Sequence, residues 1–147
     1  MIRVLFVCTG NTCRSPMAEA ILRAKKLSGI EVKSAGIYAS LGHPASDHAK
    51  NILSDQNIHQ AHSSTLLTKV EIDWATHIFT MTEGHKSIIT TSYPQSSDKT
   101  FTLKEFVLND PNNRDVFDPY GGSREMYEET FIELQALIEG LIKNIGG

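Results

Sequence analysis

A short apolar run near the start of the chain, residues 2–7, leads directly into the segment Cys8-Thr9-Gly10-Asn11-Thr12-Cys13-Arg14-Ser15-Pro16. The run predicts a buried strand, and Ser15 followed by Pro16 predicts the N-cap and the first residue of a helix. We expect Gly10 and Asn11 to adopt positive φ values, which turn successive backbone N–H groups toward one centre. This succession predicts an α/β fold with an oxyanion site at the end of its first strand.

Cys8 and Arg14, which are separated by five residues, supply the chemistry of this loop. The positive end of the following helix and the Arg14 guanidinium both favour a thiolate at Cys8, the nucleophilic form of cysteine. Arg14 can bind two phosphate oxygens, and Thr9 to Arg14 form the candidate phosphate-binding loop. A buried strand-end cysteine beside a solvated arginine is the structural alternative. The preceding strand, the Gly-Asn pair and the Ser-Pro pair favour a nucleophile loop instead.

Strands and helices alternate along the rest of the chain. Apolar runs predict strands over 31–34, 77–81 and 101–103, and helical periodicity and capping signals predict helices over 16–27, 46–56, 84–91, from 68 and from 123. Such alternation favours an open parallel sheet with right-handed crossovers and helices on both faces. Ligands of these sheets bind beyond the carboxyl ends of the strands, where the Cys8 loop lies.

Residues 109–122 are rich in Pro, Asn and Gly, which predicts a long loop. A leaving group that a thiolate displaces needs a proton, and a carboxylic acid on a loop near the phosphate would supply it. Asp118 precedes Pro119 and is therefore biased to an extended backbone. Asp110 also precedes a proline, and Asp115 lies between them. The residues alone favour Asp118 only modestly.

In these segments the chain resembles the low-molecular-weight protein tyrosine phosphatases, whose loop reads Cys-x-Gly-Asn-x-Cys-Arg-Ser followed by Pro. Ser34-Ala35-Gly36 and Asp118-Pro119-Tyr120 resemble the family's second-strand ending and acid loop, and the resemblance covers essentially the whole chain. It implies four parallel strands in the order 2-1-3-4 and a phosphocysteine mechanism without metal or cofactor. It also implies that Asp118 is the general acid.

The resemblance further implies that Asn11, Ser15 and Ser34 support the loop through a hydrogen-bond network. A histidine of the family's network has a candidate match in His62, which competes with five other histidines. A role for Ser15 as a plain helix N-cap is the alternative.

Substrate identity depends on Thr12. The family's tyrosine-specific members usually carry Ile here, and Thr12, the opening Cys8 to Ala20, Lys104-Glu105 and Gly121-Gly122 resemble the bacterial protein-arginine phosphatase branch. A small hydroxylated side chain leaves room for the guanidinium of phosphoarginine and can hydrogen-bond it, whereas Ile would leave guanidinium N–H groups unpaired. Phosphotyrosine is the alternative substrate, with Thr12 a neutral substitution, and Tyr120 lines the cleft in either case.

Cys13 is the second of two cysteines in the sequence, and both belong to the loop. A curved loop can bring two cysteine Cβ atoms within ~3.5–4.5 Å, so Cys13 is a candidate to capture an oxidised Cys8 as a reversible disulfide. The resembling family carries the same pair. An arsenate reductase shares this scaffold but needs a further cysteine pair, which the sequence lacks. A non-enzymatic phosphate-sensing module would keep the loop but has no need of an acid.

Composition fits a small intracellular enzyme. With 147 residues, 40% of them hydrophobic and 21% charged, we expect one domain over residues 1–147. A net charge of −3 without a basic run does not favour nucleic acid. No apolar stretch predicts a membrane span or a secretory signal. We expect a cytoplasmic monomer that acts on phosphorylated proteins, and no metal, since the two cysteines lack zinc-ligand partners.

Overall fold

The structure, a computed structural model, describes residues 1–58 and 61–145. Its centre is a four-stranded sheet in the order β2-β1-β3-β4. β1 pairs in parallel with β2 and β3, and β3 pairs in parallel with β4. The strands are β1 (Ile2–Cys8), β2 (Ile30–Gly36), β3 (His77–Thr80) and β4 (Thr100–Thr102). The predicted open parallel α/β sheet and its strand order are therefore confirmed.

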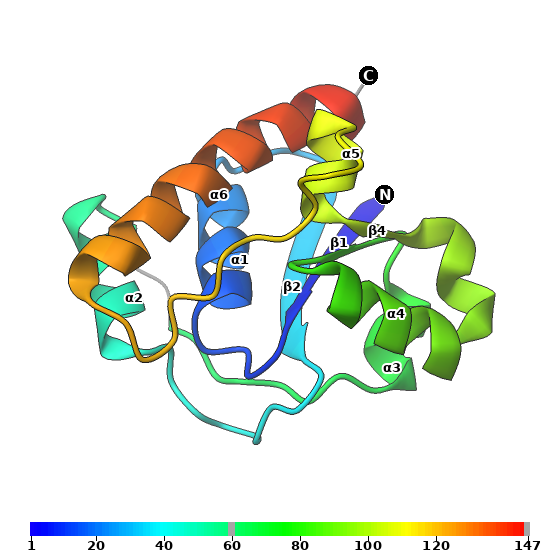
Figure 1. Ribbon diagram of the computed structural model, residues 1–147, viewed down its shortest axis with the longest axis horizontal. Coiled ribbons are helices and arrows are strands. Elements are labelled where there is room, and N and C mark those ends of the chain that lie inside the picture. Colours follow the sequence, from blue (N-terminus) through cyan, green and yellow to red (C-terminus); the bar gives the residue numbers. More distant parts are fainter. Residues whose placement is uncertain (59–60, 146–147) are drawn as a thin grey trace.

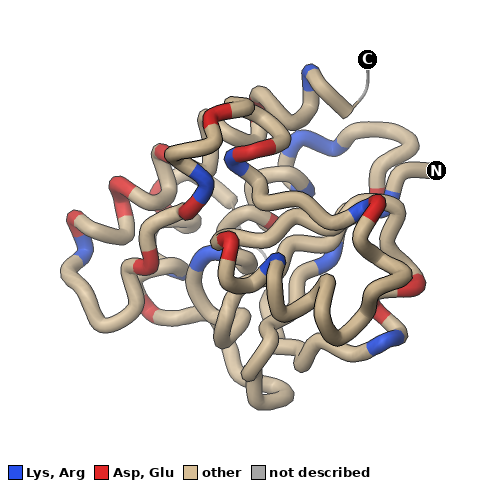
Figure 2. The backbone as a smooth tube through the Cα atoms, turned by 45° about the vertical axis from the view of Figure 1, so that its right-hand side comes forward, with Lys and Arg blue, Asp and Glu red and all other residues tan. Residues whose placement is uncertain are grey.

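Helices cover both faces of this sheet (Figure 1). One face packs against α1 (Arg14–Ala24), α2 (Asp47–Asp55), α5 (Leu103–Leu108) and α6 (Arg124–Ile145). The other face packs against α3 (Lys69–Trp74) and α4 (Glu83–Ser92), and a short 3-10 helix, η1 (Pro94–Lys99), leads into β4. Figure 2 shows acidic and basic residues interspersed over the fold, with acidic residues along α6.

β1 divides the core into two parts. Val4 and Phe6 belong to the cluster beneath α1 and α6, whereas Leu5 and Val7 belong to the cluster beneath α3 and α4. All four side chains are fully buried, as the alternation of side chains along a central strand requires. Burial of this kind stabilises the fold by about 1.5–3 kcal/mol for each large side chain. A rigid, doubly covered strand therefore carries Cys8 to the carboxyl edge of the sheet.

Two elements differ from their sequence expectation. α1 begins and ends earlier than the predicted range 16–27, and its N-cap position is Cys13, whose side chain makes no capping hydrogen bond. The prediction that Ser15 is the N-cap was therefore wrong, because the Ser15 hydroxyl has partners in the loop before the helix. α5 was not predicted, although Thr102 and Glu105 form a capping box, which the pattern Thr-x-x-Glu signals.

Other helix signals are confirmed. Ser46 accepts a hydrogen bond from the Ala49 N–H at the start of α2, and Thr68 and Glu71 form a capping box at α3. Residues 109–122 contain no helix or strand, as predicted. The helix predicted from residue 123 is α6, whose buried face includes Tyr127, Phe131, Leu134, Ile138 and Leu141. Within the described residues, no helix combines the length and the apolar character that crossing a bilayer requires.

Candidate active site

The loop between β1 and α1 forms the floor of an open pocket of about 270 Å³ at the carboxyl edge of the sheet. The predicted site residues that line this pocket are Cys8, Thr9, Gly10, Thr12, Cys13, Arg14, Asp118 and Tyr120. Tyr38, Ala39, Ser40 and His43, which the sequence analysis did not single out, complete its wall. The structure thus brings the candidate nucleophile, arginine and acid together from segments more than 100 residues apart.

Asn11 lies beneath the loop and not on the pocket wall. Its φ is 57°, as predicted, and it is fully buried. Its Nδ2 donates to Ser15 Oγ (2.8 Å) and Ser34 Oγ (2.9 Å), and its Oδ1 accepts from the Thr65 N–H (2.9 Å). The amide therefore uses both of its hydrogens and its oxygen, which fixes its orientation. Asn11, Ser15 and Ser34 thus lie in one buried network, and Thr65 is an unpredicted member.

Gly10, by contrast, does not have the positive φ that the sequence predicted. Asn11 alone makes the left-handed turn, because its side chain holds that conformation through three hydrogen bonds. Gly36, at the end of β2, is the residue whose lack of a side chain the loop requires. A Cβ there would lie 2.6 Å from the Thr9 carbonyl oxygen and 2.8 Å from the Asn11 nitrogen.

Cys8 ends β1 and is almost fully buried beside the pocket. Its Sγ lies 2.8 Å from Ser15 Oγ. Because Ser15 Oγ already accepts from Asn11, the Ser15 hydroxyl hydrogen is free to be donated to the sulfur. A hydroxyl directed at the sulfur stabilises a thiolate there.

Two further side chains extend the network. Ser34 Oγ donates to Glu19, a buried carboxylate in α1 that the sequence analysis missed. His62 Nε2 donates to the Asn11 carbonyl (2.7 Å), so the candidate match to the family's network histidine does contact the loop. Glu19 gave no local signal, because its role depends on β2 packing beside α1.

Arg14 is buried, and its guanidinium is held by the segment 109–122. Nη1 donates to the Val116 carbonyl (3.0 Å), and Nη2 lies 3.4 Å from Asp118 Oδ2. The Arg14 Nε–H is buried and has no partner among the described residues. Because Arg14 also lines the pocket, an anion bound over the loop would satisfy this orphaned donor.

Of the three candidate acids, only Asp118 lines the pocket. Its side chain is 49% exposed, its Oδ1 accepts from the Tyr120 N–H (3.0 Å), and its Oδ2 faces Arg14. Asp115 accepts from the Glu83 N–H and Asp110 from the Asn112 N–H, so both have structural partners elsewhere. Among the three candidates that the residues alone left open, the geometry therefore favours Asp118.

Cys13 is buried at the back of the loop. Its Sγ lies 3.2 Å from the Tyr127 hydroxyl of α6 and 3.7 Å from Ser46 Oγ. Burial, together with the contact to Cys13, raises the pKa of Tyr127 to about 12, so its hydroxyl keeps its hydrogen. Both cysteines are free thiols. Beside Cys13, Thr12 lines the pocket with its Oγ1 3.8 Å from Cys13 Sγ, and its carbonyl accepts from the Ser46 N–H (2.9 Å).

His85 in α4 is a further unpredicted neighbour of the loop. Its Nε2 lies 2.9 Å from Thr9 Oγ1, and its buried Nδ1 has no partner among the described residues. Burial, with a smaller contribution from Arg14, lowers the pKa of His85 to about 4, against opposing contributions from Asp118 and Asp115. A neutral imidazole therefore stands behind the loop at neutral pH. In the described part of the chain, no group of three or more His, Cys, Asp or Glu is placed to hold a metal ion.

Comparisons with known proteins agree with this geometry. The family described as low molecular weight phosphotyrosine protein phosphatase matches residues 3–146. A protein-arginine-phosphatase of Geobacillus stearothermophilus is 52% identical over 97% of this chain and 95% of its own length. The solved structure of the arginine phosphatase YwlE from that organism superposes with a TM-score of 0.96 at 51% identity, covering 99% of this chain and 94% of the other.

A second solved structure shows YwlE as a cysteine-to-serine mutant with a phosphorylated active-site serine. It matches with a TM-score of 0.94 at 39% identity, and the match covers 99% of this chain and 96% of the other.

The pKa of His85 predicts how stability depends on pH. Its folded-state pKa of about 4 lies below the ordinary value of 6.5, so the unfolded chain binds the proton first as pH falls. The free energy of unfolding should therefore decrease between pH 6.5 and 4, by about 3 kcal/mol for this group. Urea unfolding of the wild type and His85→Asn at several pH values tests this. The variant should lose less stability over that interval, and parallel losses would contradict the assignment.

Proposed function

Since the chain belongs to the low molecular weight phosphotyrosine protein phosphatase family, we propose that it hydrolyses phosphoarginine in proteins through a phosphocysteine intermediate. The observation that carries this proposal is the arrangement in one pocket of Cys8, the unpaired Nε–H of Arg14 and the half-exposed Asp118. A phosphoryl group over the loop would meet a nucleophile, a cation and a proton donor at once. A phosphate-sensing module would need no such acid.

In the first step, the Cys8 thiolate attacks phosphorus. The P–S bond forms as the bond from phosphorus to the leaving nitrogen breaks, while Arg14 and the loop N–H groups bind the equatorial oxygens. Asp118 donates its proton to the leaving nitrogen and becomes a carboxylate. The departing arginine therefore carries no negative charge on that nitrogen. The Ser15 hydroxyl, which touches the sulfur, stabilises the thiolate before attack.

In the second step, water hydrolyses the phosphocysteine. The Asp118 carboxylate takes a proton from the attacking water, the P–O bond forms and the P–S bond breaks. Inorganic phosphate leaves, and Cys8 returns to the thiolate while Asp118 is protonated again. At the end of the cycle, each residue has the same protonation and covalent state as at the start. The relative whose active-site serine is phosphorylated supports covalent transfer at the matching position.

Phosphoarginine is favoured by Thr12 and by the activity that the Geobacillus relative's name records. Thr12 lines the pocket, where its hydroxyl can accept from a guanidinium N–H. Once it has donated its proton, the Asp118 carboxylate can pair with the departing guanidinium, since its side chain lines the same pocket. Isoleucine at position 12 would replace that acceptor with a methyl-bearing carbon and leave the N–H unpaired in the site.

Phosphotyrosine is the second candidate substrate. Tyr38 and Tyr120 line the pocket with side chains that are 73% and 74% exposed, and an aromatic rim of this kind suits a phenyl ring. The family description itself names phosphotyrosine.

Location and assembly belong to the same proposal. We place the activity in the cytoplasm, in a single domain over residues 1–147 that works as a monomer on phosphorylated proteins. Two free thiols in the candidate loop support a reducing compartment, because a reactive thiolate is kept reduced there. The proposed mechanism uses no metal or organic cofactor and no nucleic acid.

Thr12→Ile tests the substrate assignment. We expect kcat/KM for a phosphoarginine peptide to fall by about tenfold or more, and that for a phosphotyrosine peptide of the same flanking sequence to stay constant or rise. Thr12→Ser, which keeps the hydroxyl, should retain the wild-type preference. An unchanged ratio of the two kcat/KM values in Thr12→Ile would remove Thr12 as the specificity residue.

Cys13 generates a prediction on redox control. Peroxide should oxidise Cys8 to a sulfenic acid, and the Cys13 thiol should displace water from it to form a disulfide that dithiothreitol reduces. Wild-type activity should then recover after peroxide and dithiothreitol treatment. Cys13→Ser keeps a hydroxyl for Tyr127 but has no thiol to capture the Cys8 sulfenic acid, so further peroxide should oxidise Cys8 to the sulfinic acid, which dithiothreitol does not reduce. The variant should therefore stay inactive. Equal recovery of both proteins would show that Cys13 only packs against α6.

A further inference from the structure

The candidate acid Asp118 lies on a segment, residues 109–122, that has no helix or strand to hold it in place. A general acid must nevertheless stay within hydrogen-bond reach of the leaving atom, and misplacement by about 1 Å can cost about 100-fold in rate. The first half of the segment is attached to the body of the protein at several points, and the residues after Val116 are mostly exposed. The attachment points therefore decide where Asp118 lies.

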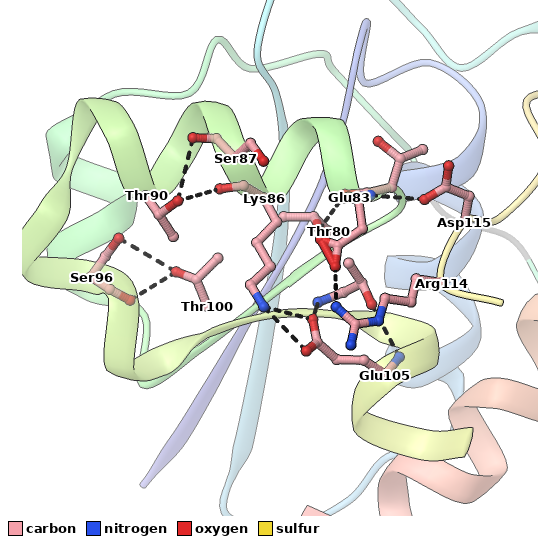
Figure 3. A network of polar contacts seen from close by, with 12 residues as sticks. Thr80, Glu83, Lys86, Ser87, Thr90, Ser96, Thr100, Glu105, Arg114 and Asp115 are labelled. Carbon is pink, nitrogen blue, oxygen red and sulfur yellow. Dashed lines mark hydrogen bonds and ion pairs between the residues drawn. The ribbon is translucent and has the colours of Figure 1, made fainter. Parts of the chain in front are cut away.

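Arg114 and Asp115 both bind Glu83, the first residue of α4. Arg114 Nη1 forms an ion pair with the Glu83 carboxylate, and Asp115 Oδ1 accepts from the Glu83 backbone N–H (2.8 Å). Figure 3 shows these two contacts reaching α4 from the same stretch of chain. Two consecutive residues that bind one residue through its side chain and its backbone restrict rotation as well as translation of the segment.

Glu83 lies in the first turn of α4, and this turn is itself fixed by other contacts. Thr82 caps α4 by accepting from the His85 N–H (3.1 Å), so the first turn of the helix is fixed. One turn further, Lys86 pairs with Glu105 (2.9 Å), the capping-box residue of α5. Figure 3 shows Glu83, Lys86, Glu105 and Arg114 as one cluster between α4 and α5. Arg114 thus joins a cross-linked pair of helices.

The next residues lead from this anchor into the pocket. The Val116 N–H donates to the Met81 carbonyl (2.7 Å), and the Val116 carbonyl accepts from Arg14 Nη1 (3.0 Å). Asp118 follows two residues later and faces Arg14 Nη2. The path from Arg114 to Asp118 is therefore short, and it runs between fixed points. The Arg114 and Glu83 side chains are 34% and 39% exposed, and ion pairs near the surface contribute little to stability, so we expect the Arg114 pair to act chiefly on the position of the segment.

We propose that Arg114 is a positioning residue for the general acid: its ion pair with Glu83 holds residues 114–118 so that the Asp118 carboxyl meets the leaving group. This inference rests on the proposed role of Asp118 and does not depend on whether phosphoarginine or phosphotyrosine is the substrate. Arg114 does not line the pocket and contacts neither phosphate nor leaving group. Its influence on the rate therefore acts through the segment that carries Asp118.

Aryl phosphates with different leaving groups test the proposal. Phenol, with a pKa of about 10, needs the acid, whereas the much more acidic 4-nitrophenol needs it little. Arg114→Ala should lower kcat/KM for phenyl phosphate by about tenfold and for 4-nitrophenyl phosphate by less than about twofold. The comparison uses kcat/KM because this ratio reports the step in which the leaving group departs and not the later hydrolysis of the phosphocysteine, which both substrates share. The inhibition constant of inorganic phosphate should not change. Arg114→Lys, which keeps the cation, should restore most of the phenyl phosphate activity.

Two controls make the outcome decisive. Arg124→Ala removes another exposed arginine with two carboxylate partners, Asp55 and Glu128, neither of which belongs to residues 109–122. It should behave as the wild type with both substrates. In an Asp118→Asn background, Arg114→Ala should cause no further loss. The proposal would be overturned if Arg114→Ala lowered the activity toward both substrates equally. It would also be overturned if adding Arg114→Ala to Asp118→Asn lowered the activity as much as it does in the wild type. If instead wild type hydrolysed only phosphotyrosine peptides, the substrate assignment would fail and this comparison would still stand.

Discussion

The left-handed backbone at Asn11 is the constraint on which the site depends. A φ of 57° costs an L-residue roughly 1–2 kcal/mol, although asparagine tolerates it better than most. Three hydrogen bonds to the Asn11 side chain and one from His62 to its carbonyl offset this cost, each contributing about 1 kcal/mol in a buried setting. The turn sends the loop back over the end of β1, and the N–H groups of Thr9 to Arg14 can then face one centre.

That turn also explains why segments distant in sequence converge on the site. Asn11 draws together the first turn of α1, the end of β2 and residues 62–65, while Gly36 lets the β2 backbone approach the loop. Arg14 connects this loop to the acid segment, because Val116 and Asp118 bind its guanidinium. Arg14 thus links the loop of the nucleophile Cys8 to the segment of the acid Asp118. The Asn11 network holds the loop, and α4 holds the acid segment. The pocket between them stays open for a phosphorylated side chain.

Much of this was predictable from sequence because its chemistry is local. The strand, the Cys8 to Arg14 loop and the helix start are consecutive, and the alternation of elements determines an open parallel sheet. What the sequence missed depends on contacts across the fold: His85 lies 76 residues from Thr9, and Tyr127 lies 114 from Cys13. Ser15 shows how tertiary contacts override a local rule. Its identity suits an N-cap, but its hydroxyl serves Cys8 and Asn11 instead.

The central claim is that Cys8 accepts the phosphoryl group, and mass spectrometry of enzyme quenched during turnover of an aryl phosphate tests it most directly. We predict phosphate on Cys8 in the wild type. We also predict no sustained turnover by Cys8→Ser, which should still bind inorganic phosphate because the loop and Arg14 remain. Phosphate on any other side chain, or a Cys8→Ser protein that turns over at a wild-type rate, would contradict the account.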